Sequence, residues 1–218
     1  DIDVYHFNEG HAVLAGLELI REKMEEGASF DEAFAETKKE IVFTTHTPVP
    51  AGNEEHPHEL LASLGAYNGL DYEQMKRLGG DPFNMTVAGL RLSALTNAVS
   101  KLHGETAQRM WHQVTDASPI IAITNGVHQN TWQAPNMALA AAHQGDLIEA
   151  HQANKEFLLA EIQHQTGQVL SPDALLIGFA RRAATYKRGD LIFRNQEELM
   201  PLLESGRIQL VFSGKAHP

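Results

Sequence analysis

The spacing of apolar residues changes along the chain between a period typical of helices and one typical of buried strands. Apolar positions three or four residues apart predict helices over residues 10–26, 30–39, 60–64, 72–78, 85–111, 147–164 and 191–203. Ser29 and Glu32 have the spacing of a capping box, which favours a helix that begins just after Ser29. The stripe over 85–111 is the longest, and we interpret it as core packing rather than a cofactor surface.

Four short runs that are mainly apolar separate these helices. They lie at 41–43, 119–123, 175–177 and 208–212. Continuous apolar runs of this length are typical of strands that are buried on both faces. The last two runs bracket a basic loop and a helix, which is the order of a βαβ unit. Alternating helices and buried strands favour the α/β class with parallel sheets.

The composition changes after the turn at Asn125 and Gly126. Beyond Trp132 the chain becomes rich in Ala, Gln and His and forms a polar helical region. We therefore expect two domain pieces, residues 1–128 and residues 129–218. The first residue is not Met, and both ends lie beside predicted strands, so we expect an internal piece of a longer protein.

The charge balance narrows the range of partners. The 218 residues include 28 acidic and 17 basic side chains, and 43% are hydrophobic, which is enough for one large core or two small ones. The acidic excess argues against nucleic acid, whose backbone is bound mainly by Lys and Arg. There is no cysteine, no apolar run of the roughly 20 residues that a membrane helix needs and no secretory signal. We therefore expect no membrane partner and a cytoplasmic location.

Histidine is abundant, with 12 in the chain, but the spacing of these residues does not indicate a metal site. The metalloprotease motif HExxH is absent. His56 and His58 flank a proline in a polar stretch, and we expect both to be exposed to solvent. His103 falls on the long predicted helix, where a buried and hydrogen-bonded histidine is a better explanation than a catalyst.

The most unusual segment is a basic cluster that follows the predicted strand 175–177. Arg181, Arg182, Lys187 and Arg188 place four cations within eight residues of a chain whose net charge is −11. Just past the carboxyl end of a buried strand, such a cluster forms an anion pocket. A solvated basic turn is the alternative, because charge clusters usually lie on exposed faces.

Four loops in a fixed order connect this cluster with a known family. They are HFNEGH at 6–11, FTTHTP at 43–48, ITNGV at 123–127 and RRAATYKR at 181–188. With NMT at 84–86, NAVSKLH at 97–103, NGVH at 125–128 and FSGKAHP at 212–218, they resemble the alpha-glucan phosphorylases (the glycogen, starch and maltodextrin phosphorylases), above all their shorter bacterial and archaeal branch. The resemblance covers nearly the whole chain and is weakest from 133 to 148.

The resemblance implies a glycosyltransferase of the GT-B type, in which two Rossmann-like domains face each other across a cleft. Such enzymes remove a terminal glucose from an α-1,4-glucan with inorganic phosphate and release glucose 1-phosphate. Family members carry pyridoxal phosphate on a lysine that lies beyond the position of Pro218, and Lys215 belongs to a different motif. We therefore expect the 218-residue chain to be inactive by itself, and a homo-oligomer is compatible with the sequence.

The resemblance also implies catalytic and phosphate-binding roles. Arg182 and Lys187 would contact the substrate phosphate and the cofactor phosphate, and Arg181 would face the cofactor phosphate at a position where many relatives have Lys. A planar guanidinium grips phosphate oxygens in pairs, whereas Lys acts as a point charge. His46 would place its backbone carbonyl near the anomeric carbon, where a dipole stabilises an oxocarbenium-like transition state, and its ring near the sugar 6-hydroxyl.

The remaining roles concern the sugar. Asn125 would hydrogen-bond sugar hydroxyls, and Glu9 and His11 would line the cleft, although many relatives have Asp at the position of Glu9. We expect Arg188 to be structural or solvated. Local structure offers alternatives: His46 could satisfy nearby backbone groups, Asn125 could belong to an ordinary turn, and Glu9 or His11 could cap the following helix.

Two other functions are compatible with the same features. A nucleotide-sugar-dependent GT-B transferase, similar to a glycogen or starch synthase, also needs an Arg/Lys pair for phosphates. A non-catalytic glucan-binding domain would be supported by aromatic platforms, but aromatic residues make up only 7% of the chain and do not cluster. The absence of GxGxxG argues against a Rossmann dehydrogenase.

Overall fold

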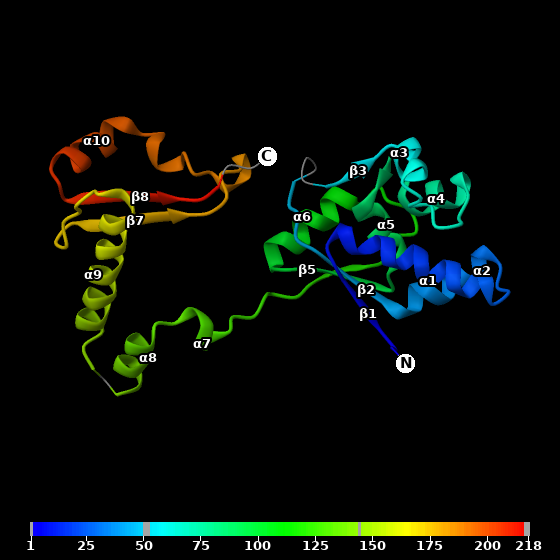
Figure 1. Cartoon of the computed structure of the whole chain (residues 1–218), viewed down its shortest axis with the longest axis horizontal. Coiled ribbons are helices and arrows are strands. Elements are labelled where there is room, and N and C mark those ends of the chain that lie inside the picture. Colours follow the sequence, from blue (N-terminus) through cyan, green and yellow to red (C-terminus); the bar gives the residue numbers. More distant parts are fainter. Residues whose placement is uncertain (1, 50–52, 144, 216–218) are drawn as a thin grey trace. The chain divides into compact units, whose positions relative to one another are not determined.

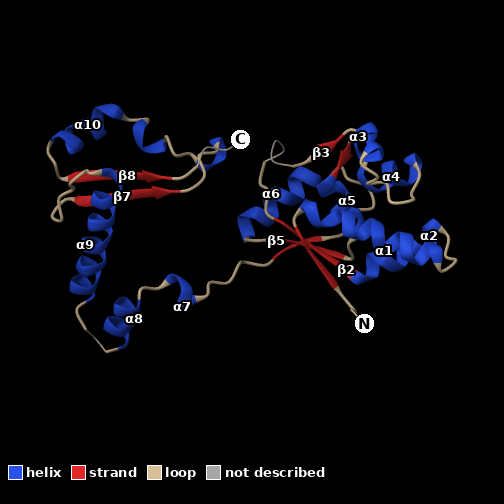
Figure 2. Cartoon of the chain, viewed as in Figure 1, coloured by secondary structure: helices blue, strands red, loops and turns tan. Residues whose placement is uncertain are grey.

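The computed structural model describes residues 2–49, 53–143 and 145–215 of the protein. The chain divides into two compact units, Asp1–Gly126 and Val127–Pro218, and each combines helices with parallel strands (Figure 1 and Figure 2). The α/β class with parallel sheets is thereby confirmed. The assignment of residues 1–128 and 129–218 to two Rossmann-like domains of the GT-B type stays a prediction.

The first unit is built on a parallel sheet with the order β1-β2-β5-β6 in the described chain. Its strands are β1 (Tyr5–Asn8), β2 (Ile41–Thr45), β5 (Leu95–Ala98) and β6 (Ile120–Ala122). The register pairs Phe7 with Phe43 and Thr44 with Asn97. Because these strands are parallel, the loops that follow them all leave from one edge of the sheet.

Helices and a short ladder complete the first unit. The helices are α1 (Leu14–Glu25), entered through the 3₁₀ turn η1 (Gly10–Val13), α2 (Phe30–Glu40), α3 (His58–Ser63), α4 (Tyr72–Gly79), α5 (Met85–Leu92) and α6 (Lys101–Trp111). The antiparallel ladder joins β3 (Glu55–His56) to β4 (Phe83–Asn84). The predicted capping box is confirmed, because the Ser29 N–H donates to Glu32 Oε2 at 2.9 Å and the Glu32 N–H donates to Ser29 Oγ at 3.4 Å.

The single long helix expected over 85–111 is wrong, because this stretch forms α5, β5 and α6 in turn. The backbone becomes extended at Ser93, whose buried hydroxyl donates to Gly89 O at 2.8 Å and lies 2.9 Å from Ser118 Oγ. The next residues pair with β2 on one side and β6 on the other. Pairing on both sides of the strand overrides the helical spacing of its apolar residues.

The strand predicted over 119–123 is confirmed as β6, but it is not buried on both faces. Ile121 is 40% exposed and Ile123 is 53% exposed, because β6 lies at the edge of the described sheet. The core lies around β2 and α5, where Phe43 is fully buried. A Cβ added to Gly89 would lie 2.8 Å from the Phe43 ring, so α5 approaches β2 closely at its glycine.

His58 is buried, contrary to the expectation of an exposed loop histidine. It is 6% exposed, its Nδ1 lies 2.9 Å from Tyr67 Oη, and its Nε2 lies 2.8 Å from Gly80 O. A carbonyl only accepts hydrogen bonds, so Nε2 carries the proton and the Tyr67 hydroxyl donates to Nδ1 of the neutral ring. The rings of Tyr72 and Phe83 lie edge-on to it, with centroids at 4.9 and 6.2 Å.

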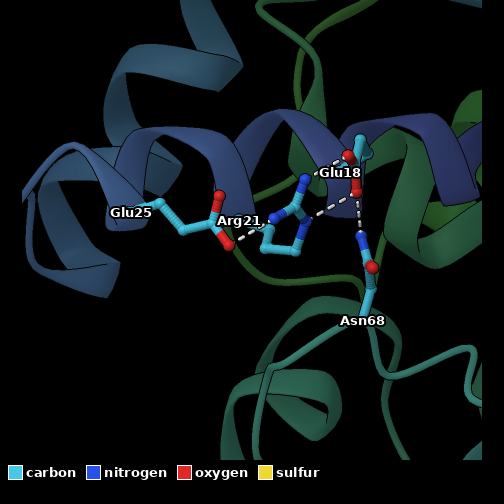
Figure 3. Close-up of polar contacts among 4 residues, drawn as sticks. All are labelled: Glu18, Arg21, Glu25 and Asn68. Carbon is cyan, nitrogen blue, oxygen red and sulfur yellow. Dashed lines mark hydrogen bonds and ion pairs between the residues drawn. The ribbon is translucent and has the colours of Figure 1, made fainter.

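A polar cluster holds the loop between α3 and α4 on α1, as Figure 3 shows. Arg21 lies between Glu18 and Glu25 and pairs with both, and the Asn68 side-chain N–H donates to Glu18. The hydrogen bonds from Arg21, and then from Asn68, lower the pKa of the Glu18 carboxyl to about 2. The cluster thereby joins segments that are 50 residues apart in the sequence.

The second unit is built on a parallel pair of strands, β7 (Leu175–Ala180) and β8 (Ile208–Ser213). Its helices are α7 (Gln129–Trp132), α8 (Pro135–Ala142), α9 (Leu147–Thr166) and α10 (Gln196–Glu204). In the view of Figure 1, α9 and α10 lie on opposite sides of the strand pair. The strands predicted at 175–177 and 208–212 are thus confirmed, but the expectation that they are buried is wrong, because the described sheet of this unit has two strands and leaves both partly exposed.

The helix expected over 191–203 begins later than predicted. Leu191–Phe193 forms a separate 3₁₀ turn, η4, and α10 starts only at Gln196. Asn195 caps α10, because its Oδ1 accepts the Glu198 N–H at 3.4 Å. Asparagine is a favoured N-cap residue, and this cap moves the helix start beyond the first apolar positions.

Candidate functional site

Three of the four motif loops follow strands of the sheet in the first unit. Glu9 follows β1, His46 follows β2, and Asn125 lies just beyond β6. The carboxyl ends of parallel strands meet at one edge of a sheet, which is where α/β proteins bind ligands. The fold therefore brings the backbones of these three residues to the same edge.

His46 is held by two contacts from the end of β1 and the residue that follows it. Its backbone N–H donates to Glu9 Oε2 at 2.7 Å, and its ring Nε2 lies 2.6 Å from Asn8 Oδ1. An amide oxygen only accepts hydrogen bonds, so Nε2 carries a proton. In the neutral ring, Nδ1 is then an acceptor. His46 is exposed, so a ligand hydroxyl can reach this nitrogen.

Glu9 has an unusual backbone conformation, with φ 73° and ψ 171°. For a residue other than glycine, this region costs about 1–3 kcal/mol. Its N–H donates to Thr44 O at 2.9 Å, and its Oε2 accepts the Thr47 hydroxyl at 3.2 Å as well as the His46 N–H. Its side chain makes no capping hydrogen bond to η1, so the helix-cap alternative for Glu9 is wrong.

A second polar network runs across β1, β2 and β5. His6 Nε2 lies 2.7 Å from Thr44 Oγ1, and the Thr44 hydroxyl donates to Asn97 Oδ1 at 2.7 Å. Because the only hydroxyl proton of Thr44 goes to Asn97, His6 is the donor in the first contact. None of the three was a predicted site residue, although each lies in a quoted motif and polar residues at strand ends are a recognisable signal.

The two remaining sugar-binding candidates of the first unit differ in their surroundings. His11 is exposed and lines a pocket of about 240 Å³ together with Glu9, Thr47 and Thr86. Asn125 is also exposed, and its backbone N–H donates to Val99 O at 3.1 Å. Glu9 and His11 therefore share one pocket, whereas Asn125 lies on the loop after the edge strand.

His103 is buried in α6, as expected, at 8% exposure. Its Nδ1 accepts the Val99 N–H at 3.2 Å, which places the proton of the neutral ring on Nε2. Within the described chain, Nε2 is buried and has no hydrogen-bond partner. The predicted hydrogen-bonded core histidine is therefore confirmed for one ring nitrogen only.

The fourth motif loop follows β7 in the second unit and is fastened to the loop after β8. The Arg181 N–H donates to Ser213 O at 3.0 Å, and the Ala183 N–H donates to Lys215 O at 2.8 Å. A Cβ on Gly214 would overlap the Arg181 carbonyl, so only glycine fits this close approach. Of the motif at 212–218, residues 216–218 lie outside the described residues.

The cations of this loop do not all line one pocket. Lys187 and Arg188 line a pocket of about 320 Å³, and Arg181 lines a second one of about 440 Å³. Arg182 lines neither of these two pockets, although its side chain is exposed. Lys187 Nζ lies 4.5 Å from the centre of the Tyr186 ring, a cation–π contact that holds the ammonium group at the loop.

Two further searches of the described residues were negative. No group of three or more His, Cys, Asp or Glu side chains there is placed to hold a metal ion. In the same residues, no helix combines the length and the apolar character needed to cross a membrane.

Comparison with known proteins relates the chain to phosphorylases, although no family model matches it. It is 36% identical to the maltodextrin phosphorylase of Thermococcus litoralis, over 100% of the chain and 32% of that protein. It is 34% identical to the glycogen phosphorylase of Mycobacterium tuberculosis, over 99% of the chain and 32% of that protein. It is 38% identical to an uncharacterised protein of Methanocaldococcus jannaschii, over 100% of the chain and 41% of that protein.

The chain thus spans about a third to two fifths of the length of these relatives. The match to the two phosphorylases runs from one end of the chain to the other and includes all four motif loops. Because the likeness covers both units, it concerns the whole chain and not one shared motif. The chain therefore belongs to the family of glycogen and maltodextrin phosphorylases, the alpha-glucan phosphorylases, and corresponds to one segment of its longer members.

Proposed function

We propose that this chain forms part of a glucan phosphorylase that cleaves a terminal α-1,4-linked glucose with inorganic phosphate and releases glucose 1-phosphate. The proposal is carried by the grouping of Glu9, His46 and Asn125 at one sheet edge in a chain whose named relatives are phosphorylases. These residues include both hydrogen-bond donors and hydrogen-bond acceptors. Such a mixture suits a sugar, because sugar hydroxyls both donate and accept hydrogen bonds.

In this proposal the residues of the first unit bind the terminal glucose. Nδ1 of His46 accepts a hydrogen bond from the 6-hydroxyl, and the His46 backbone carbonyl faces the anomeric carbon, where positive charge develops. The amide of Asn125 can donate to one hydroxyl and accept from another. Glu9 and His11 line the adjoining pocket.

The basic loop of the second unit binds phosphate in this proposal. Arg182 and Lys187 contact inorganic phosphate, and both side chains extend beyond β7, where little core packing constrains them. Arg182 can grip two phosphate oxygens at once, whereas Lys187 supplies a point charge. The exposure of Arg182 and the position of half-buried Lys187 on the lining of a pocket support this assignment, because an incoming anion can reach both.

The family implies pyridoxal phosphate as cofactor, and the donors of the basic loop fit its phosphate group. Arg181 would hold that group, with Arg182 and Lys187 between it and the substrate phosphate. The adjoining pockets share Phe179 and Phe212, apolar rings of the kind that pack against a cofactor. When bound, the cofactor would supply an acid–base phosphate group beside the substrate phosphate. A GT-B architecture and a cytoplasmic location complete the proposal.

The alternative functions have less support. The basic loop alone would also suit a nucleotide-sugar-dependent transferase, since both ligands carry phosphate. The relatives that carry a functional name are phosphorylases, however, and none of their names refers to a synthase or to a non-catalytic glucan-binding domain. The expectation that the 218-residue chain is inactive by itself stays a prediction.

The proposed phosphate site can be tested by titrating the 218-residue chain with inorganic phosphate at low ionic strength. Binding is followed through the backbone ¹H–¹⁵N signals of residues 181–188. We expect Arg182→Ala and Lys187→Ala each to weaken binding about tenfold or more, because a charge-assisted hydrogen bond contributes roughly 1.5–3 kcal/mol. Added salt should weaken binding in the wild type, since screening acts on exposed charges.

The matched control is Arg194→Ala, another exposed arginine of the second unit, which lies 3.6 Å from Asp190. We expect this variant to bind phosphate as the wild type does. If all three variants bind phosphate equally well, or if the wild type shows no shift at residues 181–188, the basic loop is a solvated turn and the phosphate site is wrong.

A further inference from the structure

We propose that Asn8 and Glu9 are positioning residues for His46, with Glu9 holding its backbone and Asn8 selecting the proton position on its ring. The inference rests on the proposed function in one respect, which is the use of His46 toward the sugar. It changes the part expected for Glu9, from a residue that binds the sugar to one that acts through His46. Asn8 had no expected role.

The argument for Glu9 begins with its backbone. Glu9 has φ 73° and ψ 171°, a conformation that glycine adopts without strain. A glutamate at this position therefore carries a conformational cost that glycine would not. Its N–H continues the β1–β2 pairing by donating to Thr44 O at 2.9 Å, which fixes the residue beside the start of the next loop. The strained conformation therefore occurs where the two loops meet.

The carboxylate explains why a side chain is needed at this position. Oε2 accepts the His46 N–H at 2.7 Å and the Thr47 hydroxyl at 3.2 Å, so one oxygen holds two successive residues of the second loop. Holding the His46 N–H fixes the peptide plane between Thr45 and His46, and the contact to the Thr47 hydroxyl holds the residue that follows. An oxygen already engaged by two donors is poorly placed to bind a sugar hydroxyl as its main task.

Asn8 acts on the ring of the same histidine. Its Oδ1 lies 2.6 Å from Nε2 and can only accept, so it favours the form of His46 that carries the proton on Nε2. That form presents Nδ1 as an acceptor. Adjacent residues at the end of β1 thus hold the backbone and the ring of one histidine, from 37 and 38 residues away in the sequence.

The ring contact is tested by NMR of the ¹⁵N-labelled 218-residue chain. We expect the His46 ring of the wild type to carry its proton on Nε2 near neutral pH. Asn8→Ala should shift the ring toward a mixture of the two neutral forms, whereas Asn8→Asp should keep the proton on Nε2 because Asp also accepts. A wild-type ring protonated on Nδ1, or no change in Asn8→Ala, would overturn the assignment of Asn8.

The backbone contact is tested by hydrogen exchange of the His46 amide. We expect Glu9→Ala to speed exchange about tenfold or more and Glu9→Gln to stay close to the wild type, since Gln still presents an oxygen acceptor. Glu36→Ala, at an exposed position of α2, is the control for the loss of a surface carboxylate. Exchange as slow in Glu9→Ala as in the wild type would refute the role of Glu9.

Glu9→Gly separates the contact from the strain. Glycine takes the same backbone conformation freely, so this variant should melt at or above the temperature of Glu9→Ala, yet exchange its His46 amide as fast. If Glu9→Gly instead protects the His46 amide as well as the wild type does, residue 9 serves the backbone shape alone and the proposal fails.

A titration with maltotriose distinguishes this proposal from the proposed function. If the Asn8 and Glu9 variants behave as expected but the wild type shows no maltotriose-dependent shift at His46, the positioning contacts stand and the sugar site is wrong. If maltotriose shifts His46 in the wild type and equally in Glu9→Ala and Asn8→Ala, the sugar site stands and the positioning role is wrong.

Discussion

Two residues of the motif loops, Glu9 and Arg188, have a positive φ angle although neither is glycine. The described residues other than glycine that have a positive φ are Glu9, Asn68, Asp116 and Arg188. Asn and Asp tolerate this region because their short side chains hydrogen-bond locally. Glu9 and Arg188 lack that advantage, and both belong to the loops whose sequence resembles phosphorylases. Backbone strain of this kind gathers at functional sites, so the conformations support the same loops as the motifs.

Glu18 is the residue from which we predict a pH dependence of stability. Hydrogen bonds from Arg21 and Asn68 lower the pKa of its carboxyl from 4.5 to about 2 in the folded protein. The folded state thus binds this proton less readily than the unfolded chain does. The stabilisation is present above about pH 4.5 and is lost as the pH falls toward 2. Denaturant unfolding between pH 6 and pH 2.5 should show this loss.

The matched variant is Glu18→Gln, which keeps the shape of the side chain but cannot titrate. Its unfolding free energy should depend less on pH than that of the wild type across the same range. Because the side chain of Glu18 is 44% exposed, we expect a modest difference that added salt reduces further. Identical pH profiles for the two proteins would show that this cluster does not contribute to stability.

Close contact between elements is clearest where α5 meets β2. Alanine normally stabilises a helix relative to glycine by roughly 0.5–1 kcal/mol. At Gly89, however, a Cβ would lie 2.8 Å from the Phe43 ring, which is fully buried. We expect Gly89→Ala to destabilise the first unit by about 1–3 kcal/mol through overpacking, measured by urea unfolding. Glu105→Ala, at an exposed site on α6, is the control and should change stability little. A stabilised Gly89→Ala variant would mean that helix propensity outweighs packing here.

In the molecule as a whole, the first unit buries many more apolar side chains than the second. Of the buried hydrophobic residues in the described chain, three belong to the second unit: Leu159, Ala174 and Leu199. Phe212 and Leu175, on the strands of that unit, are 47% and 62% exposed. A unit with few buried apolar contacts opens more easily than one with a continuous core.

We therefore predict weaker amide protection in β7 and β8 than in β2 and β5. Native-state hydrogen exchange of the 218-residue chain should show faster exchange for the strand amides of the second unit, by about a factor of ten for every 1.4 kcal/mol of difference in opening free energy. Leu92→Ala, which opens a cavity in the first unit alone, should reduce the difference. Equal protection in the two strand pairs of the wild type would contradict the prediction.

Local signals in the sequence determined much of the element pattern. The capping box at Ser29 and Glu32 depends on residues three positions apart, and it forms as predicted. The strands at 41–43, 175–177 and 208–212 were predictable because short apolar runs that contain β-branched or aromatic residues are typical of strands. The motif loops were found for the same reason, since each is a contiguous string. Their order and spacing also identified the family, which the comparisons confirm.

Only the tertiary structure decided the features that depend on distant pairing. β5 lies within a helical pattern and becomes a strand because β2 and β6 pair with it on both sides. His58 is buried because Tyr67 and Gly80 satisfy both of its ring nitrogens. The contacts of Asn8 and Glu9 with His46 join residues that are 38 and 37 positions apart in the sequence. The spacing of apolar residues within one element does not predict contacts of this kind. Hydrophobic spacing reports which face of an element is apolar, whereas contacts between strand ends depend on sheet order and register.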